Sequence, residues 1–261
     1  MRGYGDSDKP KEIANYHIDK LVEDLKLLPS ALGRSKIDVL LAHDWGGVIG
    51  WIFVARFPEM VGRFVPMNCV HPQAFQEHIR SKWSQFKKSW YVFFFQMPWV
   101  PEWWMKLEDF KWLTNGFTNP RTQELVISEE DLNVYKYVNS KPVRVHTPSS
   151  PVPSSGALTY PINYYRALDL LGNKGKKLAR IQVPTCLVFG TGDSYLESTM
   201  VDRTAQFCDK FEVHKLDGIS HWIQQEAPES VNEIVRKFLS RSLFVETNVC
   251  HYRGRSGIYN R

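Results

Sequence analysis

The sequence has few cysteines and no long hydrophobic run, and each shortage excludes a class of protein. Its four cysteines form no C-x-x-C pair and show no Cys/His ligand spacing, so we expect no metal site. Cys69 and Cys186 lie in apolar stretches, which is typical of buried thiols in a reducing compartment. No apolar run reaches the roughly 18 residues of a membrane-spanning helix. The polar start of the chain shows no signal peptide.

The charge is also low, which argues against nucleic-acid binding. The net charge is +5, and lysine and arginine are scattered apart from short runs such as residues 174–177. Hydrophobic residues make up 43% and charged residues 23% of the 261 residues, as in a globular protein. This length allows one large domain, or one domain with an inserted lid.

Residues 36–51 combine a short apolar run, a turn with two glycines and an apolar segment typical of a helix. Strand, sharp turn and helix are the context of a nucleophile elbow, in which the nucleophile occupies the centre of the turn. Here that residue is Asp44 rather than serine or cysteine. A carboxylate in this place attacks carbon and forms an ester that water must hydrolyse. The alternative is that Asp44 only caps the following helix.

The remaining pattern predicts an α/β core interrupted by a helical region. Between His71 and about Lys177 strand signals vanish and aromatic residues become dense, which indicates a lid that lines an apolar pocket. Alternatively, these aromatic residues only pack the lid. We expect core at residues 1–70 and 179–243, the lid at 71–178 and an unstructured tail at 244–261. The Pro/Ser-rich residues 140–155 are expected to be a disordered excursion within the lid.

Several core elements are predicted individually. We expect Asn15 to cap a first helix that Pro29 ends or kinks. One strand is interrupted by Pro66, which cannot donate to the hydrogen-bond ladder. The predicted elements are helix 16–28, strands 61–68, 185–189 and 211–216, and helix 228–239.

Three polar side chains follow predicted strands. Asp44 follows one strand, Asp193 a later strand, and His221 lies in the loop after the next. Open parallel sheets bind ligands at the carboxyl ends of their strands. The order nucleophile, acid, histidine is that of α/β-hydrolases. His221 is therefore a candidate base that activates water, with Asp193 as its orienting acid. Taken singly, Asp193 could be a turn residue and His221 an ordinary loop histidine.

Six motifs carry a resemblance to a known family. They are R-G-Y-G-D-S-D-K-P (2–10), H-D-W-G-G (43–47), F-F-Q-M-P-W (94–99), N-Y-Y-R (163–166), G-T-G-D (190–193) and S-H-W-I-Q-Q-E-A-P (220–228). The chain resembles eukaryotic epoxide hydrolases of the α/β-hydrolase fold, close to the membrane-anchored vertebrate members. The resemblance implies a mostly parallel sheet with an inserted helical lid, and no cofactor. Asp44 would be the nucleophile, Asp193 the acid and His221 the base.

The resemblance also implies two lid tyrosines, Tyr91 and Tyr165, that donate hydrogen bonds to the epoxide oxygen. Two phenols stabilise the alkoxide that ring opening produces, whereas a halide leaving group needs no acid. They therefore favour an epoxide over the alternative, a haloalkane dehalogenase. The Trp45 N–H would stabilise the intermediate of ester hydrolysis. The aromatic lid favours a bulky apolar epoxide, such as a fatty-acid or terpenoid epoxide.

The sequence departs from this family at its start. The family's first strands, and an H-G-x-P turn that supplies the second oxyanion N–H, have no counterpart in these residues. We therefore expect a truncated chain, and a further alternative is a catalytically impaired product that at most binds ligands. Relatives are tethered to the endoplasmic reticulum by an N-terminal helix, so we expect the cytoplasm or the cytoplasmic face of that membrane.

Overall fold

The structure is a computed structural model that describes residues 1–141, 157–168 and 177–241. It contains two compact units. The sheet unit comprises Lys26–Lys88, Pro120–Thr122 and Lys176–Arg261. The helical unit comprises Met1–Leu25, Ser89–Asn119 and Gln123–Gly175. Residues 142–155 of the Pro/Ser-rich stretch and the predicted tail lie outside the described residues, and the core and lid bounds stay a prediction.

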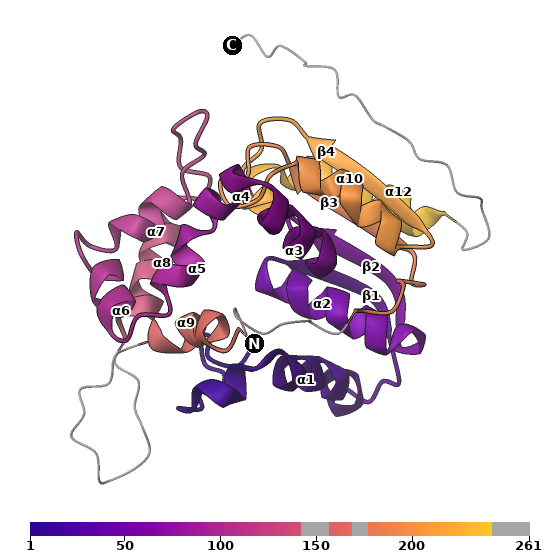
Figure 1. The fold of residues 1–261 in the computed structure, drawn as a ribbon, viewed down its shortest axis with the longest axis horizontal. Helices are drawn as coiled ribbons and strands as arrows, with labels where there is room; N and C mark the ends of the chain where they lie inside the picture. The colour runs from indigo at the N-terminus through magenta and orange to yellow at the C-terminus, as the bar shows by residue number, and fades with distance from the viewer. Residues whose placement is uncertain (142–156, 169–176, 242–261) are drawn as a thin grey trace. The chain divides into compact units, whose positions relative to one another are not determined.

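The sheet unit is built on a parallel sheet of four strands in the order β1-β2-β3-β4, as Figure 1 shows. Each predicted strand is confirmed to within two residues at either end. β1 lies at one edge of the described sheet and pairs with β2 from Ile37–Val61 to His43–Met67. The strands are β1 (Ile37–His43), β2 (Val61–Met67), β3 (Thr185–Gly190) and β4 (Phe211–Leu216).

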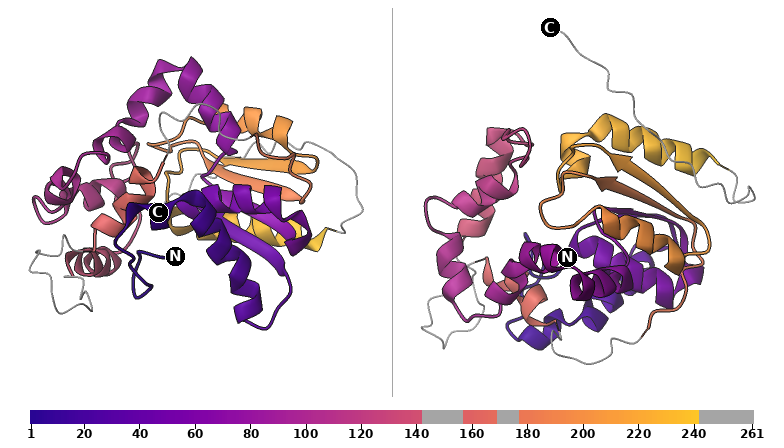
Figure 2. Two further views of the ribbon diagram at one scale, coloured as in Figure 1. Left: turned by 60° about the horizontal axis from the view of Figure 1, so that its bottom comes forward. Right: turned by 45° about the horizontal axis from the view of Figure 1, so that its top comes forward.

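Helices cover both faces of this sheet, which explains the continuous apolar runs of β2 and β3. On one face, Leu187 and Phe189 of β3 pack with Met200 and Val201 of α10 (Thr199–Thr204). On the opposite face, side chains of β2 and β3 pack against α12 (Pro228–Ser240). Figure 2 shows α12 and α10 on opposite sides of the strands. The other helices of this unit are α2 (Trp45–Arg56), η2 (Pro58–Met60), α3 (Pro72–Ser81), α4 (Trp83–Lys88), η3 (Ala205–Phe207) and α11 (Ile223–Glu226).

Pro66 lies inside β2, an interior strand, without ending it. The Phe64 N–H donates to Pro184 O and the Asn68 N–H to Val188 O, on the β3 side of the strand. Because N–H groups two residues apart point to the same side, Pro66 removes the donor between these two bonds. The residues of β2 that pair with β3 are Phe64, with Thr185, and Met67, with Val188. They lie on either side of Pro66. The sheet therefore accommodates Pro66 by losing one bond of the ladder.

Of the two predicted effects of Pro29, to end or to kink the first helix, the ending is wrong. The helix α1 (Ile18–Ala31) continues past it and contains Pro29 in its last turn, where the proline costs one backbone hydrogen bond rather than a whole ladder. Gly33 closes the segment with a φ of +67°, and Arg34 N donates to Pro29 O at 2.8 Å. The start also differs, because Asn15 lies within a 3-10 helix, η1 (Ile13–Tyr16), that precedes α1.

The helical unit is held together by a tyrosine cluster and a buried ion pair. Tyr16 and Tyr164 rings pack with centroids 5.6 Å apart, and the Tyr164 hydroxyl donates to Arg2 O at 2.7 Å. Arg166 donates to both carboxylate oxygens of Glu102, at 2.7 and 2.9 Å. Two parallel bonds of this kind fix relative orientation as well as distance. The helices here are α5 (Trp90–Phe94), α6 (Val100–Met105), α7 (Lys111–Gly116), α8 (Glu129–Ser140) and α9 (Thr159–Arg166).

Candidate active site

Asp44 occupies the turn between β1 and α2, and its backbone is strained. Its φ is +52° and its ψ is −124°, a region that residues other than glycine rarely adopt. Strain of this size persists only where the surrounding structure enforces it, and it is concentrated at functional sites. The alternative interpretation, in which the Asp44 side chain caps α2, is wrong, because that side chain forms no cap hydrogen bond. The turn at Asp44 thus has the geometry of a nucleophile elbow, in which the side chain of the central residue projects from the turn.

The glycines after Asp44 allow the helix to begin close to the sheet. A Cβ on Gly47 would lie 2.5 Å from the Cβ of Cys69, just after β2. One turn later, a Cβ on Gly50 would lie 2.7 Å from the Phe64 ring. Atoms cannot approach this closely without displacing the backbone, so larger residues would push α2 away from β2. The position of Asp44 at the start of α2 thus depends on these small residues.

The structure brings Asp44, Asp193 and His221 together in the sheet unit. His221 Nε2 lies 3.4 Å from Asp44 Oδ2, and its Nδ1 lies 2.8 Å from Asp193 Oδ2. The imidazole is buried between the two carboxylates. One ring nitrogen therefore faces the proposed nucleophile while the other is held by an acid, which is the relation found in catalytic triads.

The Asp193 carboxylate is completely buried, and hydrogen bonds fix its orientation. Its Oδ1 accepts from the backbone N–H groups of Tyr195 and Leu196, at 2.7 and 3.0 Å. Its Oδ2 is bonded to Asn68 Nδ2 at 3.0 Å as well as to His221. A buried carboxylate with donors on both oxygens cannot rotate freely. Asp193 can therefore hold the imidazole in one orientation.

The three groups shift each other's pKa in opposite directions. Burial alone would lower the pKa of His221, but the carboxylates of Asp193 and Asp44 raise it to about 10. Burial alone would raise the pKa of Asp44, but the hydrogen bond and charge of His221 lower it to about 2. The Trp45 N–H adds a hydrogen bond to the Asp44 carboxylate. Near neutral pH the free protein thus holds an ionised carboxylate against an imidazolium.

Asn68 is a site residue that the sequence analysis missed. It follows β2 with a φ of +40° and is completely buried. Besides Asp193 Oδ2, its Nδ2 contacts the carbonyl oxygens of Ser220 and His221 at 2.9 and 3.1 Å. Its Oδ1 accepts from the Gly190 N–H at 2.7 Å. This one amide links the ends of β2 and β3 to the histidine loop. Its position at the end of the predicted strand 61–68 was the available signal.

His43, next to Asp44, also supports the histidine loop. Its Nε2 lies 2.9 Å from His221 O, and since a carbonyl only accepts, Nε2 carries the proton. Burial and the charge of His221 lower the pKa of His43, so this ring is neutral. The two imidazole rings pack with centroids 4.7 Å apart. The loop that carries His221 is therefore held by backbone contacts from both Asn68 and His43.

Tyr91 and Tyr165, the two predicted acids, lie together within the helical unit. Their ring centroids are 5.7 Å apart at an interplanar angle of 81°. Tyr165 lies on α9, and its carbonyl accepts from Gln96 Nε2 at 2.8 Å. The next residue, Arg166, forms the buried ion pair described above. These contacts fix Tyr165 beside Tyr91, so the helical unit presents two neighbouring phenols.

In the described part of the chain, no helix combines the length and apolar character that crossing a membrane requires.

The sheet unit supplies a carboxylate on a strained turn together with a histidine–aspartate pair. Such a set can form an ester on the carboxylate and then activate water to hydrolyse it.

Comparison with known proteins agrees with this arrangement. The profile of a family described as alpha/beta hydrolase fold matches residues 1–228. The chain is 36% identical to epoxide hydrolase 1 of Caenorhabditis elegans, over 92% of this chain and 57% of the worm protein. It is 37% identical to epoxide hydrolase 4 of Homo sapiens, over 92% of this chain and 63% of the human protein. It thus spans about three fifths of the length of these two curated relatives.

A solved structure is similar over most of both chains. The crystal structure of Bacillus megaterium epoxide hydrolase in complex with an inhibitor matches with a TM-score of 0.78 and 27% sequence identity. The match covers 92% of this chain and 82% of the bacterial one.

Proposed function

The chain belongs to the α/β-hydrolase fold family, as its motifs predicted, and we propose that it is an epoxide hydrolase. Its reaction converts an apolar epoxide to a vicinal diol without a cofactor. One observation carries the proposal: Asp44, on its strained turn, faces an imidazole that Asp193 holds from the other side. The similarity to proteins named epoxide hydrolases supports the same chemistry. The activity of the whole protein is part of this proposal.

In the first step, Asp44 attacks a ring carbon of the epoxide. The new bond joins a carboxylate oxygen to that carbon, and the carbon–oxygen bond of the strained ring breaks, which leaves an alkoxide. Tyr91 and Tyr165 donate to this oxygen where its charge develops, and one of them gives it a proton. That tyrosine then regains a proton from solvent. The product of the step is an ester between Asp44 and the substrate, which now carries one hydroxyl group.

In the second step, His221 activates water. Ester formation removes the charge of Asp44, which is one of the two carboxylates that raise the pKa of His221. The imidazolium therefore gives up its proton more easily and becomes a base. It takes a proton from water while the oxygen attacks the ester carbonyl, and the Trp45 N–H stabilises the resulting oxyanion. As this intermediate collapses, the bond between the Asp44 carbonyl carbon and the substrate oxygen breaks, and His221 returns its proton to that oxygen. The diol is released and the Asp44 carboxylate is regenerated.

The direct experiment measures diol formation by residues 1–261. The purified chain is incubated with a bulky apolar epoxide such as a fatty-acid epoxide, and the diol is quantified by mass spectrometry. A parallel assay with a long-chain haloalkane measures halide release. Diol formation above the rate without protein supports the proposal. Halide release without diol would favour a dehalogenase. Neither product from a folded chain would contradict both and favour an impaired, ligand-binding protein.

Phenylalanine substitutions test the roles of the two tyrosines. Each of Tyr91→Phe and Tyr165→Phe removes one hydroxyl while it keeps the ring, so we expect ester formation to slow by roughly 10²-fold. Ester hydrolysis, which does not involve the alkoxide, should change little. Rapid mixing with excess protein separates the two steps. Tyr137, an exposed residue of the same unit, provides the control, and Tyr137→Phe should leave both rates unchanged. Equal rates in all three variants would exclude the two phenols as acids.

Asn68→Asp tests the amide that links the strand ends. Aspartate keeps the size of asparagine and tolerates a positive φ, but it replaces the Nδ2 donor by an oxygen that faces Asp193 and two carbonyls. A hydrogen bond to a charged group contributes about 1.5–3 kcal/mol, so we expect ester hydrolysis to slow by roughly ten- to a hundredfold. Ester formation should change less, because Asn68 contacts the acid and the histidine loop rather than Asp44.

The pH dependence distinguishes positioning by Asn68 from a purely structural role. If Asn68 orients Asp193 and His221, Asn68→Asp should also move the pH dependence of ester hydrolysis, because its carboxylate adds charge beside them. A loss of folded protein alone would reduce both steps equally and leave the pH dependence unchanged. That result would contradict the positioning role.

A further inference from the structure

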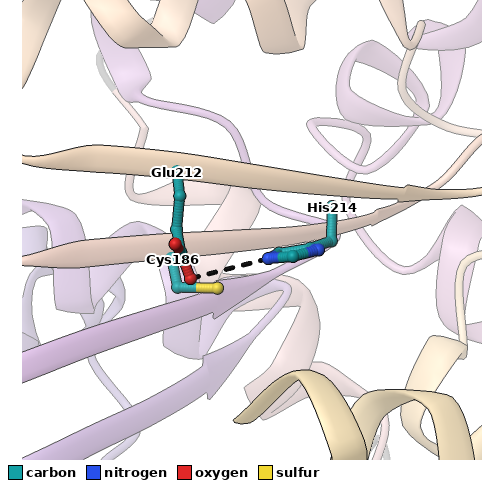
Figure 3. A group of neighbouring side chains, drawn as sticks. All are labelled: Cys186, Glu212 and His214. Carbon is teal, nitrogen blue, oxygen red and sulfur yellow. Dashed lines mark ion pairs between the residues drawn. The ribbon is translucent and has the colours of Figure 1, made fainter. Parts of the chain in front are cut away.

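We propose that Cys186, Glu212 and His214 form a binding site for a divalent transition-metal ion such as Zn²⁺. Their donor atoms, one sulfur, one oxygen and one nitrogen, all lie within 4.8 Å of one another. Figure 3 shows the three side chains converging from two neighbouring strands. The site is separate from the candidate active site and does not depend on the proposed function. It also departs from our sequence-based expectation that the chain holds no metal.

The register between β3 and β4 brings these three residues together. Cys186 on β3 pairs directly with Glu212 on β4. His214 lies two residues further along β4, so it projects from the same face as Glu212. In the sequence, 26 positions separate Cys186 from Glu212, and no short motif joins them. The Glu-x-His spacing on a strand is the one local signal.

The donor set suits zinc. Thiolate, imidazole and carboxylate bind Zn²⁺ at about 2.0–2.3 Å, so three donors around a tetrahedral ion lie roughly 3.3–3.6 Å apart. The present separations of up to 4.8 Å would have to shorten to that range when the ion binds. A thiolate and a carboxylate together neutralise the charge of the ion. The fourth position would be left to water, as in zinc sites with three protein ligands.

The surroundings of Glu212 prepare it to bind an ion. The Arg241 guanidinium pairs with Oε2, which fixes the carboxylate from one side. The other oxygen, Oε1, is buried and lies 3.5 Å from His214 Nε2. The Glu212 carboxylate also interacts with the Cys186 thiol, so it already contacts both other members of the group. Arg241 thus orients Glu212 from outside the group while its carboxylate faces the other two donors, as hydrogen-bonded carboxylates do in metal sites.

Two members of the group are partly exposed to solvent, and binding of the ion releases one proton. Glu212 and His214 lie on β4, an edge strand of the described sheet, and their side chains are 15% and 17% exposed. Zinc binds the thiolate form of cysteine, so the Cys186 thiol must lose its proton. Binding exchanges this proton for the metal ion, and the proton leaves to solvent.

Cobalt titration of the full chain tests the site. The protein is freed of metal with a chelator and titrated with Co²⁺, which has a charge-transfer absorption when it binds a thiolate. We expect this band to saturate at one equivalent and to disappear when Zn²⁺ displaces Co²⁺. His214→Gln should weaken Co²⁺ binding by at least about tenfold, because even outer-sphere partners of a metal contribute that much. Cys186→Ser should remove the band.

Cys208→Ser is the matched control. Cys208 is also buried in the sheet unit, but it is not part of the group, so its variant should bind Co²⁺ like the wild type. Circular dichroism of each metal-free variant establishes that it is folded. If Cys186→Ser fails to fold, the affinity of His214→Gln decides, since that side chain is partly exposed. Absence of the band in the wild type, normal affinity in His214→Gln, or loss of the band in Cys208→Ser would each overturn the proposal.

Discussion

Asp44→Ala is expected to abolish diol formation, lowering its rate by about 10⁴-fold or more, because no other group in the proposed mechanism can form the ester. Asp44 lies on a turn where it has a positive φ and its side chain faces an imidazole. Binding of the substrate should be retained, since Tyr91 and Tyr165 are unchanged. A competition assay with an apolar inhibitor separates binding from turnover.

Asp44→Asn is the matched variant for the same prediction. Asparagine keeps the size of aspartate and tolerates the positive φ, so the turn should be preserved. Its amide is a poor nucleophile, and initial turnover should fall as in Asp44→Ala. Because slow hydrolysis of the amide would restore aspartate, the residue at position 44 must be checked by mass spectrometry. If either variant, with its identity verified, retained a wild-type rate, Asp44 could not be the nucleophile.

The pH dependence of unfolding gives a readout of the Asp44–His221 pair that does not require activity. The pKa of His221 is raised from an ordinary value of 6.5 to about 10 in the folded protein. This shift stabilises the fold fully below pH 6.5, and the stabilisation is lost as pH rises through 10. Asp44 is one of the carboxylates that raise this pKa, so in Asp44→Asn the stabilisation should be smaller and its loss complete at a lower pH, as denaturant unfolding measured across the pH range would show.

The parts of the site that sequence could predict follow a simple physical rule. Parallel strands end at the same edge of a sheet, so polar residues just after strands meet there. Asp44, Asp193 and His221 obey this rule, and the structure brings them together. Their catalytic roles stay predictions. Asn68 obeys the same rule and was still missed, because one buried amide after a strand has no recognisable spacing. Its importance becomes visible only through its four hydrogen-bond partners.

The success or failure of the other structural predictions also has physical causes. Pro29 was expected to end or kink its helix, but the helix continues to Ala31, because a proline in the last turn removes little of the hydrogen-bond ladder. Pro66 was rightly kept within a strand, because the loss of one donor toward β3 is tolerated between intact bonds. Cys186 and Glu212 could not be joined from sequence, since their pairing depends on the register of two strands. Register is set by the whole sheet rather than by local pattern.

His221→Gln is expected to trap the ester on Asp44. Glutamine fits the same space but cannot accept a proton from water at neutral pH, so ester hydrolysis should slow by about 10³–10⁴-fold. Ester formation requires only the Asp44 carboxylate and the phenols, and should continue. After incubation with an epoxide, intact-mass spectrometry should show the protein mass increased by the mass of one substrate molecule. Peptide mapping should place the addition on Asp44.

The double variant Asp44→Ala, His221→Gln provides the control, because it should show no added mass under the same conditions. An adduct on another residue would indicate direct alkylation by the epoxide rather than catalysis. If His221→Gln turned over at the wild-type rate, or lost activity without any adduct on Asp44, the two-step mechanism would be refuted. The same experiment separates a defect in the first step from a defect in the second. An adduct without diol shows that Asp44 and the phenols work and that the hydrolytic half of the site limits the protein.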